Sequence, residues 1–132
     1  MGGPWAFDLD GCMVDALSAT SVRPLVPEVL ARLRDATVPV VVWSAGGAEY
    51  ARRILKRAGI DDLVDACYDK VRDVDGRWCL DVFAAEHRPT VCVDDDPTGV
   101  PDTVDVIAVP PYLAANPHNR GFLTVWDAVL DA

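Results

Sequence analysis

Two groups of carboxylates, Asp8 with Asp10 and the run 94–96, each follow a short apolar segment of the sequence. Asp8 and Asp10 stand two residues apart, and Gly11 comes directly after them. Side chains two residues apart in an extended segment point the same way, so these two acids start on one side. Like charges held close together stay ionised only where a cation or hydrogen-bond donors lie between them. The pattern therefore indicates a cation site, with an Asp- and Gly-rich surface turn as the alternative.

The chain of 132 residues is predicted to form one domain, 1–132, because this length is typical of a single core. Its net charge of −9 disfavours a protein that grips nucleic acid with its whole surface, and leaves nucleic acid only as a substrate. No apolar run approaches the ~20 residues that a membrane helix needs, and no secretory signal is recognisable. The four cysteines are scattered without a C-x-x-C pair, which favours a reduced, cytoplasmic protein.

Apolar runs and helical periodicities alternate along the chain. The run that ends at Asp8 is predicted to be a buried strand, and similar runs predict strands at 40–43, 64–68, 90–93 and 104–109. Apolar positions at helical spacing predict helices over 28–34, 48–58, 78–86 and 124–130. Gly59 is expected to end the second helix and Thr124 to cap the start of the last. Residues 12–22 are predicted to form a loop with a short hairpin.

Strands that alternate with helices predict an α/β fold. The expected form is a three-layer, Rossmann-like parallel sheet with helices on both faces and right-handed crossovers. Sites in such sheets form beyond the carboxyl ends of the strands. Asp8, Ser44 and Asp94 each end a predicted strand, so the fold is expected to gather these side chains into one crevice.

Four segments with chemical character follow one another in order. Residues 7–11 contain D-x-D-G, and the apolar run 40–43 ends in Ser44. Lys70 comes next, and then the apolar run 91–93 leads into Asp94 and Asp95. In this order the segments resemble the four motifs of the haloacid dehalogenase (HAD) superfamily of phosphohydrolases, over nearly the whole chain. The resemblance implies a HAD-like core and a magnesium-dependent phosphatase that works through an aspartyl-phosphate.

The resemblance also assigns roles to individual residues. Asp8 would be the nucleophile, and Asp10 would protonate the leaving oxygen and later activate water. Mg²⁺ would be held by Asp8, the main-chain carbonyl of Asp10, and Asp95. Ser44, with the main-chain amides of Ala45 and Gly46, would bind the phosphate, and Lys70 would bind it as well and neutralise its charge.

Three assignments stay open from the sequence. The basic residue of the third motif is Lys70 or Arg77, with Lys70 favoured. Asp94 and Asp96 are further candidates to contact the metal, although an Asp before a proline often only starts a turn. The family usually has Thr or Val at the position of Cys12, so a threonine hydroxyl contact would be missing here.

Members of this superfamily often carry a cap domain after the first motif or between the third and fourth. The intervals that follow Asp10 and Lys70 are too short for one, so a capless core with an open site is expected. An open site goes with large substrates, such as a phosphorylated protein or nucleic acid, and the basic residues of the helix over 48–58 give weak support to a polyanion. The alternative is a catalytically silent HAD-fold binding module.

Overall fold

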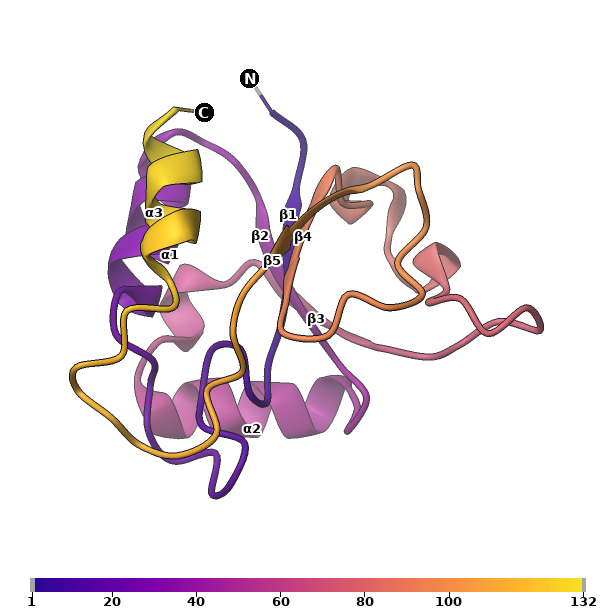
Figure 1. Cartoon of the computed structure of the whole chain (residues 1–132). Coiled ribbons are helices and arrows are strands. Elements are labelled where there is room, and N and C mark those ends of the chain that lie inside the picture. The colour runs from indigo at the N-terminus through magenta and orange to yellow at the C-terminus, as the bar shows by residue number, and fades with distance from the viewer. Residues whose placement is uncertain (1, 132) are drawn as a thin grey trace.

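The computed structural model describes residues 2–131 and contains a five-stranded sheet whose paired strands are all parallel (Figure 1). The strand order is β3-β2-β1-β4-β5. The strands are β1 (Trp5–Asp8), β2 (Val40–Ser44), β3 (Ala66–Asp69), β4 (Val91–Asp94) and β5 (Asp105–Ala108). The helices are α1 (Val26–Asp35), α2 (Ala48–Ala58) and α3 (Leu123–Leu130), with three 3₁₀ helices, η1 (Asp61–Leu63), η2 (Leu80–Val82) and η3 (Ala85–His87). The predicted parallel α/β fold is confirmed.

The two faces of the sheet are covered in different ways. Alternation along β1 sends Phe7 to one face and Ala6 to the other. The first face packs against the apolar sides of α1, α2 and α3. The second face carries Trp43 and Cys92 and is covered by two connections, the one from β3 to β4, which includes η2 and η3, and the one from β4 to β5. Figure 1 shows both connections on the opposite side of the sheet from α1 and α3.

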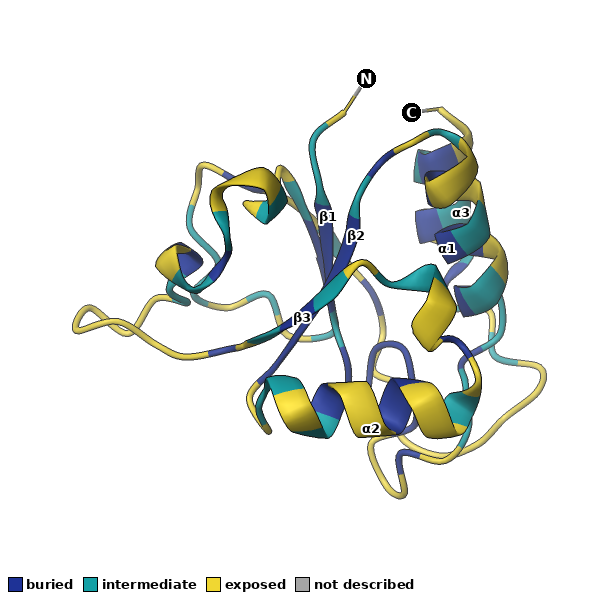
Figure 2. Cartoon of the chain, turned by 180° about the vertical axis from the view of Figure 1, so that it is seen from behind, coloured by how far each residue is buried: buried dark blue, intermediate teal, exposed yellow. Residues whose placement is uncertain are grey.

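The α-helices follow the predicted periodicity. The buried side chains of α1 are spaced i, i+3, i+4 and i+7, and they are Val26, Val29, Leu30 and Leu33. Helix α2 spans the predicted 48–58 and ends at Gly59, whose φ of +77° places it in the left-handed region. Its outer side is exposed, as Figure 2 shows. Each of the two helices is therefore positioned by the burial of an apolar stripe on its own surface.

The prediction of a helix over 78–86 is wrong. Its place is taken by η2 and η3, because the backbone is extended at Cys79 (φ −80°, ψ 116°) and again at Phe83 (φ −79°, ψ 141°), which no α-helix allows. The Cys79 N–H donates instead to the Val71 carbonyl at 2.8 Å. Leu80 still enters the core of the second face, through a shorter turn.

The remaining differences are at element ends. Thr124 does not cap α3, because the helix begins one residue earlier and Phe122 precedes it. The strands predicted at 64–68 and 104–109 are observed as β3 and β5 with shifted or shortened ends. In the loop predicted over 12–22, Val14 and Val22 form an antiparallel bridge. No helix within residues 2–131 is long and apolar enough to cross a membrane.

Candidate active site

The expected site residues meet where four adjacent strands end. β1 ends at Asp8, β2 at Ser44 and β4 at Asp94, and Lys70 directly follows β3. They line a hollow of about 260 Å³, whose full lining is Asp8, Asp10, Ser44, Ala45, Gly46, Lys70, Trp78, Asp94, Asp95 and Asp96. A hollow of about 290 Å³ between α2 and β3 shares none of these residues. The expected site residues are therefore gathered in the strand-end hollow.

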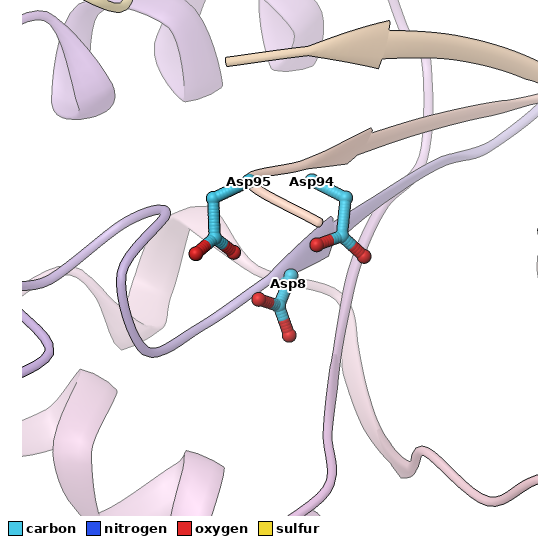
Figure 3. Close-up of side chains that lie close together, drawn as sticks. All are labelled: Asp8, Asp94 and Asp95. Carbon is cyan, nitrogen blue, oxygen red and sulfur yellow. The ribbon is translucent and has the colours of Figure 1, made fainter. Parts of the chain in front are cut away.

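Three carboxylates converge in this hollow. Asp8, Asp94 and Asp95 each offer an oxygen, and these oxygens lie within 4.8 Å of one another (Figure 3). The strand pattern explains two of them: Ala6 and Cys92 face the second side of the sheet, so Asp8 and Asp94, two residues farther along, start on that same side. Asp95 joins them from the turn after β4.

Gly11 makes room for this cluster. Its φ is +78°, a conformation that residues with a side chain rarely adopt. A Cβ atom added here would lie 2.7 Å from a carboxylate oxygen of Asp95. The glycine of the D-x-D-G segment is therefore required both by the turn and by the approach of Asp95.

Lys70 is the cation of the site. Its backbone N–H donates to the Ser44 carbonyl (2.9 Å), which continues the pairing of β2 and β3 and keeps Lys70 at the strand ends. Its buried ammonium lies 2.6 Å from Asp94 Oδ2 and 3.4 Å from Asp8 Oδ1. Burial opposes the charge, but Asp8 and Asp94 outweigh it and raise the pKa of Lys70. The side chain is thus held in its charged form between two acids.

One ammonium does not balance three carboxylates. Burial, and then the neighbouring Asp94, raise the pKa of Asp8 to about 8 although Lys70 opposes the shift. Burial likewise raises the pKa of Asp94 against the pull of Lys70. The cluster is short of positive charge and offers only oxygen donors, a set that suits a hard cation such as Mg²⁺.

The oxygens of Asp94 are already engaged. Oδ2 accepts from Lys70, and Oδ1 accepts the N–H of Asp96 at 2.9 Å. Asp8 and Asp95 are therefore better placed than Asp94 to hold a cation. Asp96 lines the hollow, but its carboxylate accepts the N–H of Thr98 at 3.3 Å, as in a turn that an Asp initiates.

Asp10 is held by a residue that the sequence did not single out. The hydroxyl of Tyr50, in the first turn of α2, donates to Asp10 Oδ1 at 2.9 Å. Forty positions separate the two residues, so no local pattern predicts the contact. The bond engages Oδ1 and does not involve the other carboxylate oxygen of Asp10.

The turn after β2 differs in part from the expectation. The Ser44 side chain is buried and its Oγ accepts the N–H of Gly46 at 3.1 Å. The Gly47 N–H donates to the Ser44 carbonyl at 3.0 Å. Because these two amides are bonded within the turn, an anion would meet the Ser44 hydroxyl more readily than the Gly46 amide.

The structure gives positions for two residues whose assignment the sequence left open. Lys70 reaches the carboxylates, whereas Arg77 is exposed and does not line the hollow. The Cys12 thiol donates to the Val93 carbonyl at 3.6 Å, so this position still contacts β4. Burial raises the pKa of Cys12, which makes it a packing residue and a poor nucleophile.

Comparison with known proteins agrees with this geometry. Residues 7–130 match the family model described as NLI interacting factor-like phosphatase. A comparison with curated proteins gave no match. The matched range includes all the residues that line the strand-end hollow. The chain therefore belongs to the NLI interacting factor-like phosphatases, a family of the HAD superfamily.

Proposed function

We propose that the protein is a magnesium-dependent phosphomonoesterase in which Asp8 is transiently phosphorylated. The observation that carries this proposal is the position of Asp8, a partly exposed carboxylate between the Lys70 ammonium and the oxygens of Asp94 and Asp95. A nucleophile so placed meets a phosphate with positive charge beside it, and the acids around it provide a metal site.

The chemistry uses two acids in turn. A carboxylate oxygen of Asp8 attacks phosphorus, the bond from phosphorus to the ester oxygen breaks, and Asp10 gives its proton to that oxygen. Water then attacks the phosphorus of the aspartyl-phosphate while Asp10 takes a proton from it. Inorganic phosphate leaves and the carboxylate of Asp8 is restored. Tyr50 supports the proposal because it orients Asp10 without occupying both of its oxygens.

The remaining groups neutralise charge. Lys70 would pair with an oxygen of the transferring phosphoryl group, and the Ser44 hydroxyl would donate to another. Asp8, Asp95 and the carbonyl of Asp10 would hold Mg²⁺. The ion, when bound, would shield the nucleophile from the negative charge of the substrate.

We further propose that the chain acts as a single core domain with an open site and accepts large substrates. In residues 2–131, the two intervals where relatives carry caps are occupied by the loop that the Val14–Val22 bridge closes and by the segment with η2 and η3. Arg53 supports an anionic macromolecule as substrate: its guanidinium is exposed and lies 5.8 Å from the ring centroid of Tyr50, next to the site.

The test is a substrate screen with and without Mg²⁺. The panel contains p-nitrophenyl phosphate, a sugar phosphate, a 5′-phosphorylated oligonucleotide and a phosphoserine peptide. We expect metal-dependent release of phosphate, and we expect acid quenching to trap a phosphorylated enzyme that Asp8→Asn does not form. If a folded protein releases no phosphate from any of the four, it is a silent binding module. Turnover that survives Asp8→Asn would contradict the covalent route.

A further inference from the structure

The ammonium of Lys70 is surrounded by aromatic rings as well as by acids. Its Nζ lies 4.4 Å from the ring centroid of Trp78 and 5.2 Å from that of Trp43. These are distances at which a cation is attracted to the face of an indole. Asp8 and Asp94 complete the surroundings. Trp78 also lines the strand-end hollow, so the ring and the ammonium share the site.

Trp78 is brought to this position by its backbone. Arg72 and Trp78 form an antiparallel bridge, and the Trp78 N–H donates to the Gly99 carbonyl at 2.8 Å. The guanidinium of Arg72 lies 4.1 Å from the centroid of the same ring. The indole is therefore fixed from the segment that follows Lys70 and from the loop after β4, and its place does not depend on Lys70.

Packing alone does not favour tryptophan here. The Nε1 atoms of Trp43 and Trp78 are buried and, among the described residues, have no hydrogen-bond partner. A buried N–H without a partner costs free energy, which a leucine or phenylalanine of similar packing would avoid. Tryptophan is, however, the strongest aromatic partner of a cation. The unpaired N–H groups thus indicate that tryptophan is present here for the attraction between its ring face and a cation.

We infer that Trp78 is a positioning residue that holds the Lys70 ammonium beside Asp8. Lysine has a flexible stem, and here its shortest contact is with Asp94 at 2.6 Å, against 3.4 Å to Asp8. An ion pair with Asp94 alone would draw the ammonium away from the nucleophile. The indole face restrains it without adding a negative charge, so the full charge of Lys70 stays available to the phosphoryl group. This inference rests on the proposed function.

The test compares variants of the full chain in magnesium-dependent hydrolysis of p-nitrophenyl phosphate. Trp78→Leu is expected to lower kcat about tenfold, which corresponds to ~1.4 kcal/mol, with a smaller change in KM. Trp78→Phe, which keeps a ring face, is expected to restore most of the loss. The matched control is Trp126→Leu on α3, an indole of similar partial burial outside the hollow, which is expected to leave kcat unchanged.

A double variant separates positioning from packing. If Trp78 acts through Lys70, then Trp78→Leu added to Lys70→Met lowers kcat no further than Lys70→Met alone. An additional tenfold loss in the double variant, or a Trp78→Phe variant as slow as Trp78→Leu, would overturn the inference. The proposed function is judged separately, because it requires wild-type turnover that Asp8→Asn abolishes, whatever the Trp78 variants do.

Discussion

Replacing Asp8 by asparagine is expected to stabilise the metal-free protein while it abolishes turnover. Burial and Asp94 raise the pKa of this carboxyl from 3.8 to about 8. One pKa unit corresponds to about 1.36 kcal/mol. At pH 7 the unfolded chain has Asp8 ionised, whereas the folded chain holds it mostly protonated, and this difference lowers the free energy of unfolding by about 4 kcal/mol. The amide of asparagine carries no charge in either state and avoids this cost. The net gain in the free energy of unfolding is expected to be about 2–4 kcal/mol.

The pH dependence has a definite sign. A carboxyl whose pKa is raised on folding contributes stability fully below its unfolded pKa of 3.8, and this contribution is lost as the pH rises through about 8. In EDTA, the melting temperature of Asp8→Asn should therefore exceed that of the wild type by a margin that grows over this range. A gain of this size corresponds to roughly 6–15 °C for a chain of this length.

Thermal unfolding followed by circular dichroism measures this difference. Asp102→Asn, which removes an exposed carboxylate, is the control and is expected to leave the melting temperature unchanged. Adding Mg²⁺ at 100-fold over its Kd is expected to stabilise the wild type by about 2.7 kcal/mol and the variant by less. An Asp8→Asn protein that is less stable than the wild type in EDTA, or that gains as much from Mg²⁺, would refute the account of a charge-deficient carboxylate cluster.

Three further predictions concern the surroundings of the site. Burial disfavours the charge of Asp15, but hydrogen bonds from Ser18 and neighbouring N–H groups lower its pKa to about 2. The stability that the charged Asp15 contributes is therefore present above pH 3.8 and is lost as the pH falls to about 2. In urea unfolding, Asp15→Asn should lose less stability than the wild type when the pH is lowered over this range. Arg23 is fully buried and its guanidinium donates to three acceptors. Arg23→Met leaves these acceptors unpaired and is expected to lower the free energy of unfolding by about 3–5 kcal/mol in urea; a loss below about 1 kcal/mol would contradict this role. Tyr50→Phe removes the donor to Asp10 and is expected to lower kcat about fivefold, or ~1 kcal/mol, with little change in melting temperature.

The sequence predicted the sheet because its buried strands are continuous apolar runs. The run 40–43 was expected to be covered on both faces, and β2 is buried throughout. The rule that sites form at the carboxyl ends of parallel strands then placed Asp8, Ser44 and Asp94 together, as they are in the structure. The apolar runs alone predict the strands, and the rule for parallel sheets adds the position of the site.

The contacts that tune the site could not be predicted in this way. Tyr50 lies on the predicted helix over 48–58, but which helical side chain reaches Asp10 depends on how α2 packs against the first face. The failed helix at 78–86 has the same cause. The spacing of apolar residues does not reveal that the backbone is extended at Cys79, Phe83 and Ala84.

That failed prediction bears directly on the chemistry. Because residues in a strand alternate, Asp8 and Asp94 belong to the second face of the sheet, the one that α1, α2 and α3 leave uncovered. A regular α-helix over 78–86 would have required helical backbone at Cys79 and Phe83, which are extended. The observed bridge to Arg72 instead leaves the Trp78 ring beside Lys70. The irregular cover of the second face is therefore what allows the Trp78 ring to lie beside Lys70 and the carboxylates of the strand-end hollow. A sequence with a stronger helix over 78–86 would be expected to lose this position of the ring even if all four motifs were kept.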